Sequence, residues 1–215
     1  MAHHHHHHDD GGDPCGGHGG EASPLGPEMG VQYSLYSKID LDNVQCLNEA
    51  KEGSGKSVFK PWEQRLDRDK YVDSDADEEL LFNIPFTGNV KLKSILVVGG
   101  DAGTHPSKVR IFKNRPQMTF SDARAAPEQE FELQHDSSGC LEYPLRAVKF
   151  SSVHHLSLHF PGNFGDDVTR IYYIGLHGEF SEAQRQGIVL CSYESAPNPA
   201  DHKVQQEMPT SSMIQ

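Results

Sequence analysis

The sequence "DSDADEELLFNIPF" (73–86) joins a run of acidic residues directly to a run of large apolar residues. Side chains two positions apart on a strand share one face, so the apolar run from Leu80 to Phe86 fits a strand that is buried in a core. Acidic side chains are almost never buried without a partner. The stretch therefore predicts a buried strand that is entered through an acidic rim, Asp73 to Glu79, lying in water.

Similar short runs follow this stretch, and clusters of Gly, Pro, Asn, Asp and Ser separate them. The predicted strands are "NVKLKSILVVG" (89–99), "KVRIFKN" (108–114), "QEFELQ" (129–134), "AVKF" (147–150), "VHHLSLHF" (153–160), "TRIYYIGLHGEF" (169–180) and "GIVLCSYE" (187–194). About eight or nine strands at this spacing, with hardly any helix, are typical of a β-sandwich or β-barrel.

The residues before this region predict one more strand and one short helix. Val31, Tyr33 and Leu35 alternate with polar neighbours, which indicates a strand over 31–39. Apolar residues then recur at helical spacing behind Asp40, so we expect a helix of about two turns within 40–50.

Both ends of the chain are predicted to be disordered, which leaves a folded domain over residues 30–200. Residues 1–30 hold five acidic residues, eight Gly and three Pro and no Lys or Arg, so we expect 1–29 to be a disordered arm. Its six consecutive His residues are typical of an expression tag, although natural His-rich arms exist. The two prolines of "SAPNPA" (195–200) should end the last strand and leave a flexible tail at 201–215.

Charge and hydropathy exclude several classes of partner. The chain has 19 Lys and Arg against 31 Asp and Glu, a net charge of −12, which disfavours binding to nucleic acid. No apolar run approaches the roughly 18 residues that a membrane helix needs, and no apolar signal segment follows Met1. We therefore expect a cytoplasmic protein, with the nucleus as a second location.

The four cysteines form no C-x-x-C pair, and we expect reduced thiols.

Two segments resemble known sites but lack essential residues. "EGSGKS" (52–57) ends like a phosphate-binding loop, yet Ala50 stands where the first glycine belongs, so a flexible loop is expected. In "DSDADE" (73–78), a calcium loop of the EF-hand type would need Gly at Glu78 and Glu at Ile84. A solvated rim is therefore favoured over a calcium site of another type.

The histidines of "VHHLSLHF" invite a metal interpretation, but His155 and His159 would lie about 13 Å apart on a strand. Zinc ligands lie only about 2 Å from the ion, so an exposed polar face is favoured. We predict no catalytic residue, no cofactor and no metal site.

Several longer motifs carry a family resemblance. Besides residues 73–95, they are "FKPWEQR" (59–65), "RIFKN" (110–114), "HHLSLHF" (154–160), "IYYIGLHGEF" (171–180) and "NPADHK" (198–203). Over about residues 30–202 the chain resembles the PITH domain, the proteasome-interacting module of thioredoxin-like proteins, and most resembles members in which this domain stands alone. The resemblance implies a jelly-roll β-sandwich similar to galactose-binding-like domains. It also implies a non-catalytic binder of the regulatory particle of the 26S proteasome. Because no C-x-x-C is present, thioredoxin activity does not carry over.

We therefore expect a protein that is monomeric when free and that binds and modulates the proteasome, with the acidic rim as one half of a charge-complementary interface. The predicted partner-binding residues are Asp73, Asp75, Asp77, Glu78, Arg115 and His202. The alternative is a module that binds a sugar or another small polar molecule. Such a module would use the end loops "KNRPQMTFSD" (113–122) and "FPGNFGDD" (160–167).

Overall fold

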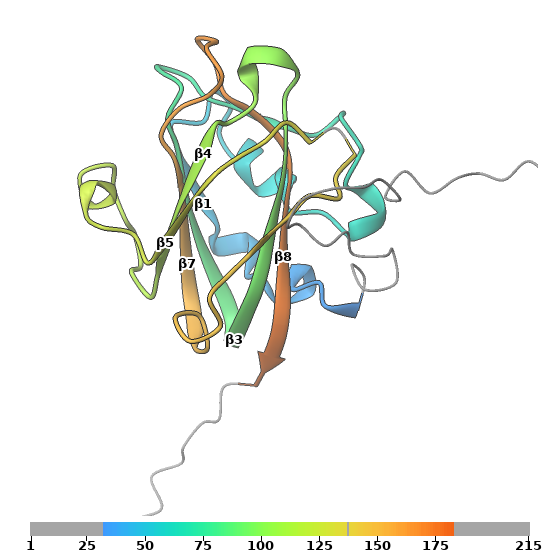
Figure 1. Ribbon diagram of the computed structural model, residues 1–215, viewed down its shortest axis with the longest axis vertical. Helices are drawn as coiled ribbons and strands as arrows, with labels where there is room; N and C mark the ends of the chain where they lie inside the picture. The colour runs from blue at the N-terminus through green and yellow to red at the C-terminus, as the bar shows by residue number, and fades with distance from the viewer. Residues whose placement is uncertain (1–31, 137, 183–215) are drawn as a thin grey trace, which may run out of the picture. The chain divides into compact units, whose positions relative to one another are not determined.

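Strand β3 (Leu80–Gly99) belongs to both layers of the structure, a computed structural model that describes residues 32–136 and 138–182. Its first half pairs with β7 (Val153–Phe160) and its second half with β8 (Arg170–Ser181), both antiparallel. The register shifts between Pro85 and Val90, where the strand bends from one layer into the other (Figure 1). The two strands predicted at 79–86 and 89–99 are thus one strand with a bend.

The remaining strands extend these two layers on either side of β3. The layer of β7 also contains β4 (Lys108–Lys113), β5 (Gln129–Glu132) and β1 (Gln45–Leu47). The layer of β8 also contains β2 (Val72–Asp73) and β6 (Glu142–Pro144). Every strand pair in the described part of the chain is antiparallel, and the predicted jelly-roll β-sandwich is confirmed.

The connections hold short 3-10 helices instead of the predicted α-helix. Their bounds are η1 Tyr36–Lys38, η2 Leu41–Asn43, η3 Ser54–Val58, η4 Trp62–Gln64, η5 Ala102–Thr104 and η6 Asp122–Arg124. The predicted helix over 40–50 is wrong because the chain turns once at η2 and then pairs with β3 as β1. Pairing with the edge of β3 outweighs the weak local helical preference.

Two predicted strands are also absent, and one lies outside the described residues. The described part of the segment 31–39, residues 32–39, mostly forms η1 and isolated bridges that insert Leu35 and Ile39 into the core. Residues 147–150 form a turn in which Val148 is 92% exposed, while β6 lies just before it. The predicted strand at 187–194 lies outside the part of the chain that the structure describes.

The main core lies between the two layers and is filled by both halves of β3 and by the strands that flank it. Its largest members include Leu80, Phe82, Ile84, Phe86, Leu92, Ile95, Leu156, Leu158, Phe160, Ile171, Ile174 and Leu176, all less than 9% exposed. Leu81 points to the opposite side of β3 and packs with Phe112 and Met118. The predicted burial of the apolar run at 80–86 is confirmed.

A loop over residues 115–125 covers the outer face of β4 and β7, and Asn83 holds it there. The side-chain amide of Asn83 donates to the carbonyl of Met118 at 2.9 Å and accepts from the N–H of Met118 at 3.1 Å. Ser157 donates to the same amide oxygen at 3.0 Å. Ser157 and His159 are therefore buried, and the prediction that this histidine-rich face is exposed is wrong for both residues.

The bend of β3 predicts a requirement for glycine at position 88. A Cβ built on Gly88 would lie 2.7 Å from ring atoms of Phe180 and 3.0 Å from the carbonyl oxygen of Ser181. We expect Gly88→Ala to lower the free energy of unfolding by about 1–3 kcal/mol, as overpacking does, although alanine is otherwise the better strand residue. Chemical denaturation measures this change. Gly162→Ala is the control, because the nearest atom to its Cβ would be 3.8 Å away. Equal stability of the two variants would contradict the packing argument.

Burial of His159 predicts a pH dependence of stability. Burial, and to a lesser degree the charge of Arg110, lowers the pKa of His159 to about 4. Above about pH 6.5 the histidine is neutral in both states, whereas toward pH 4 the unfolded chain alone gains the proton. The free energy of unfolding should therefore fall by about 3 kcal/mol more in the parent than in His159→Gln between pH 7 and pH 4. Exposed His154, changed to Gln, serves as control and should leave the parent's pH profile unchanged. If the free energy of unfolding changed with pH in the same way in the parent and in His159→Gln, the lowered pKa of His159 would be refuted.

Candidate functional site

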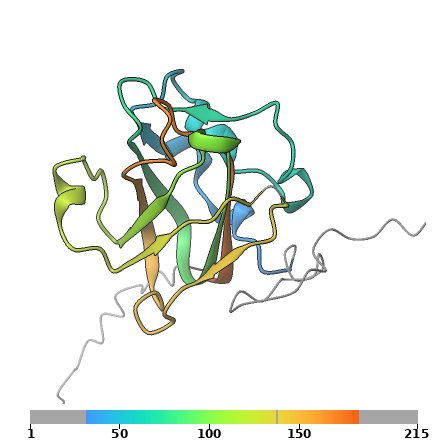
Figure 2. The same ribbon diagram turned by 45° about the horizontal axis from the view of Figure 1, so that its top comes forward.

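Five exposed carboxylates gather at one end of the sandwich, which we call the acidic end. Its members are Asp75, Asp77, Glu78, Asp166 and Asp167. The loop between β7 and β8 lies beside the acidic segment, because the hydroxyl of Thr169 donates to the carbonyl of Glu78 at 2.7 Å (Figure 2). It also meets η5, because the N–H of Phe164 donates to the carbonyl of Gly103 at 3.0 Å. Among the described residues, none of these five carboxylates forms an ion pair with Lys or Arg.

Asp73, the first acid of the segment, has a structural contact that the others lack. Its two carboxylate oxygens accept from Nε and Nη2 of Arg170 at 2.7 and 2.6 Å, across the pairing of β2 with β8. The hydrogen bonds to Asp73 raise the pKa of Arg170. Asp73 is half-buried and occupied inside the domain, so it is less available to a partner than the five carboxylates of the acidic end.

Asn48 fixes the backbone of the acidic segment. It lies in the left-handed region with φ of 66°, and its side-chain N–H donates to Asp77 Oδ1 and to the carbonyl of Glu79, each at 2.7 Å. Its amide oxygen accepts from the N–H of Ala76 at 3.1 Å, and its carbonyl accepts from Asp75 at 3.0 Å. The neutral side chain of Asn48 thus holds the acidic segment in place by hydrogen bonds, as a bound cation holds a calcium loop. Within residues 32–136 and 138–182, no group of three or more His, Cys, Asp or Glu is arranged to hold a metal ion.

An exposed aromatic ring lies in the same loop as Asp166 and Asp167. Phe164 is 46% exposed and stacks on His135, with ring centroids 4.4 Å apart. His135 in turn packs on buried His105, whose centroid is 4.8 Å away. Burial lowers the pKa of His105, which keeps this support neutral. Because its members come from three separate segments, no local pattern in the sequence indicated this stack.

The other predicted site residues lie elsewhere. Arg115 donates to Glu128 Oε1 at 3.0 Å and packs over the ring of Phe112, on the outer face of β4 and away from the acidic end. His202 lies outside the described residues, as do the arm at 1–29 and the tail at 201–215. The two loops of the alternative ligand site do not both line the hollow beside the first of them. The hollow lined by Arg115, Pro116, Met118, Ser121, Asp122 and Ala125 includes no residue of 160–167.

The glycine-containing segment 52–57 is ordered as η3 and is not the flexible loop that was predicted. The N–H groups of Gly53 and Gly55 both donate to the carboxylate of Glu49, at 2.6 Å each. The backbone donors that a phosphate-binding loop would offer are therefore occupied by the chain itself.

The two cysteines in the described part of the chain differ. Cys46 is a free thiol, and burial, together with the charge of Glu49, raises its pKa. Cys140 is disulfide-bonded, so the expectation of reduced thiols is wrong for this residue.

The role of Asn48 predicts unequal effects of two polar substitutions. Asn48→Ala removes the side-chain hydrogen bonds and places a residue with a Cβ but no polar group in the left-handed region, which should cost about 2 kcal/mol of unfolding free energy. Asp75→Asn changes an exposed side chain and should stay within about 0.5 kcal/mol of the parent. Urea denaturation of both variants checks this. A loss of stability on adding a chelator to the parent would instead show that a cation holds the segment.

The chain is similar in sequence to proteins that contain a PITH domain. The model of the PITH domain matches residues 26–197. The chain is 64% identical over 191 residues to "PITH domain-containing protein CG6153" of Drosophila melanogaster, covering 86% of this chain and 90% of that protein. It is 54% identical over 187 residues to "PITH domain-containing protein 1" of Homo sapiens, covering 87% and 89%.

Solved structures with a similar fold include carbohydrate-binding modules of Clostridium perfringens. A family 32 module of NanJ, solved in complex with galactose, matches with a TM-score of 0.47 and 10% identity, covering 67% of this chain and 97% of that one. The third family 32 module of a family 31 glycoside hydrolase matches with a TM-score of 0.46 and 15% identity, covering 70% and 97%. These values are too low to transfer a ligand. In the described ranges, no helix is long and apolar enough to cross a membrane.

Proposed function

Because this chain belongs to the PITH domain family, we propose that it is a non-catalytic protein that binds the regulatory particle of the 26S proteasome and modulates the proteasome. The proposed partner is inferred from membership in this family. The acidic end is the proposed binding surface, since its five exposed carboxylates have no ion-pair partner within the described part of the domain. They would meet a basic surface on the proteasome.

The composition of the acidic end supports a protein interface. Interfaces concentrate their binding energy in a few aromatic or arginine residues that a polar rim surrounds. Phe164 has the position of such an anchor, because its ring stacks on that of His135 and lies in the same loop as Asp166 and Asp167. Charge complementarity would then set the rate and orientation of association more than its affinity.

The opposite end of the sandwich carries cations as well as acids, because Asp40 and Asp42 lie beside Thr87 at the bend of β3. The turn before β7 carries Arg146 and Lys149, and the nearby end of β4 carries Lys113. The Lys113 amine donates to the carbonyl of Lys149, and the Lys149 amine donates to the carbonyl of Glu128 at 2.6 Å, so neither charge is neutralised by these contacts.

The chemistry of the described residues supports a binding function without catalysis. Cys46 is a weak nucleophile because burial and Glu49 disfavour its thiolate. The amides of η3 are occupied by Glu49, and the sequence has no C-x-x-C pair. We further propose that the protein is monomeric when free, that it acts in the cytoplasm and also in the nucleus, and that it binds neither nucleic acid nor membrane.

Charge reversal at the acidic end tests the proposed function. We expect Asp75→Lys combined with Glu78→Lys to weaken binding to purified 26S proteasome at least tenfold near 0.1 M salt, by removing two attractive charges and adding two repulsive ones. The matched control is Glu63→Lys combined with Glu132→Lys, which changes the net charge equally at exposed positions outside the acidic end. Equal affinities of the two double variants would show that the acidic end is not the interface.

A truncation distinguishes the sandwich from the tail in the same assay. The family resemblance and the flexibility predicted for the tail after Asp201 together suggest that the tail takes part in binding, with His202 as its candidate residue. Removing residues 203–215, and separately changing His202 to Ala, should each weaken binding if the tail contributes. If both proteins bind and alter peptide hydrolysis by the proteasome like the full chain, the tail has no part in the interface.

A further inference from the structure

Phe164 presents one face of its aromatic ring to solvent. The ring of His135 stacks on the other face, with centroids 4.4 Å apart and an angle of 28° between the two planes. The centroid of His105 lies 6.0 Å from that of Phe164 and 4.8 Å from that of His135, so both histidines lie on the same side of Phe164. Because Phe164 is still 46% exposed, its exposed area belongs to the open face and the edge of the ring.

The backbone of the loop that carries Phe164 is fixed by hydrogen bonds. The N–H of Phe164 donates to the carbonyl of Gly103 at 3.0 Å. The side-chain oxygen of Asn163 accepts from the N–H groups of Gly165 and Asp166 at 2.9 and 3.0 Å, and its side-chain N–H donates to the carbonyl of Asp166 at 2.9 Å. The ring is therefore held in position before a partner arrives, which lowers the entropic cost of binding.

Carboxylates of the acidic end lie beside this loop. Asp166 packs on the same glycine that holds Phe164, because a Cβ built on Gly103 would lie 3.1 Å from the Cβ of Asp166. Glu78 comes from the acidic segment, and its Cγ lies 3.8 Å from a Cβ built on Gly162. In the described part of the chain, no Lys or Arg pairs with either carboxylate, and none lies over the ring of Phe164.

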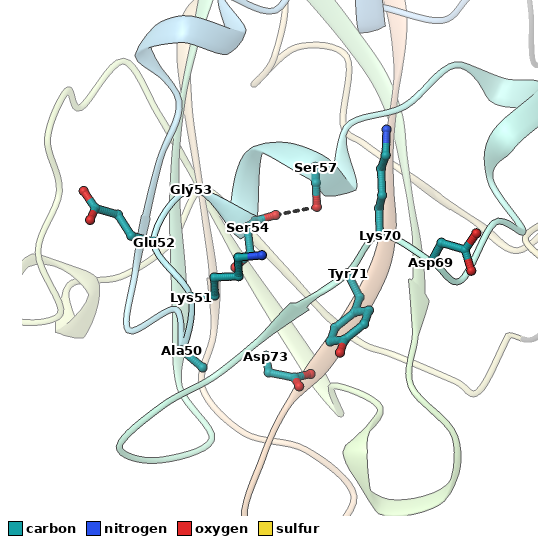
Figure 3. A pocket seen from close by; sticks show the side chains of 10 residues that line it. All are labelled: Ala50, Lys51, Glu52, Gly53, Ser54, Ser57, Asp69, Lys70, Tyr71 and Asp73. Carbon is teal, nitrogen blue, oxygen red and sulfur yellow. Dashed lines mark hydrogen bonds between the residues drawn. The ribbon is translucent and has the colours of Figure 1, made fainter.

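Elsewhere in the domain, a ring and a carboxylate placed together hold an arginine. The guanidinium of Arg170 lies 4.3 Å from the centre of the Tyr71 ring and donates to both oxygens of Asp73. Tyr71 and Asp73 line one hollow, and Figure 3 shows the ring beside the carboxylate. Two further examples are Arg68 with Tyr172 and Asp101, and Arg115 with Phe112 and Glu128.

We propose that Phe164 and Asp166 receive an arginine side chain of a protein partner. Its guanidinium would stack on the open face of Phe164 and donate to the carboxylate of Asp166. A guanidinium is flat and weakly hydrated and has paired donors, so it can stack on a ring and bind a carboxylate at once, whereas an ammonium group is a compact point charge. Such an arginine would belong to the basic surface that the acidic end meets in the proposed function, on which this inference rests.

NMR titration of the full chain with a short peptide that carries two arginines between glycines tests the proposal. The comparison is the same peptide with lysines, which has equal charge. We expect saturable shifts of the Phe164 ring signals and the Asp166 amide with the arginine peptide, and binding at least about twofold weaker with the lysine peptide, which cannot stack flat on the ring. Equal affinities would show that charge alone is recognised and would rule out the arginine site.

Variants of Phe164 separate stacking from simple apolar contact. Phe164→Leu keeps an apolar side chain without an aromatic face and should weaken binding of the arginine peptide about two- to fivefold, the effect of a cation–π contact at an exposed site. Phe164→Trp should bind at least as tightly as the parent. The matched control is Tyr71→Leu, which removes an exposed ring that Arg170 already covers, and it should bind like the parent. The proposal is overturned if Phe164→Leu binds normally, or if folded Tyr71→Leu loses as much affinity.

The peptide assay does not involve the proteasome, so its result is separate from that of the charge-reversal assay. If the arginine peptide binds through Phe164 while Asp75→Lys combined with Glu78→Lys leaves proteasome affinity unchanged, the arginine site stands and the proposed role of the acidic end fails. Galactose is the last arm of the titration. Saturation of the Phe164 shifts by galactose, and not by the arginine peptide, would replace the arginine site with the alternative sugar-binding function.

Discussion

The passage of β3 from one layer to the other is the constraint on which the rest of the structure depends. Each half of this strand pairs with a different partner, β7 or β8, and both halves bury side chains in the same core. The strand runs out to the bend near Gly88 and then returns, so its two ends lie at the same end of the sandwich. This return brings the acidic segment before Leu80 close to η5 after Gly99, and the loop between β7 and β8 joins them there.

Outside the core, single polar side chains organise whole loops. Asn83 holds the loop over β4 and β7, Asn48 holds the acidic segment, and Glu49 holds the start of η3. In each case a buried or half-buried side chain satisfies backbone groups that have no partner in a strand or helix. The candidate surfaces thus rest on a rigid support although they are built from irregular backbone.

Local patterns predicted the long strands but not the short ones or how the loops meet. The alternation in 80–86 and 153–160 identified buried strands correctly, since burial on one face leaves a period of two in the sequence. The helical spacing within 40–50 predicted a helix that does not form, because this segment pairs with β3 and such a contact between distant residues leaves no local pattern. Asp166 and Phe164 were not connected with the run at 73–79, and His159 was placed in water, because contacts between distant segments leave no local signal.

The burial of Cys46 makes this residue an internal reporter of local opening. Alkylating reagents attack the thiolate, which burial and Glu49 disfavour in the folded chain. Gly55 packs so closely against half-buried Cys46 that a Cβ there would lie 2.3 Å from the cysteine Cβ, so movement of η3 away from β1 would expose more of the sulfur. A rise in the labelling rate of this thiol therefore reports movement of η3 away from β1, without any engineered probe.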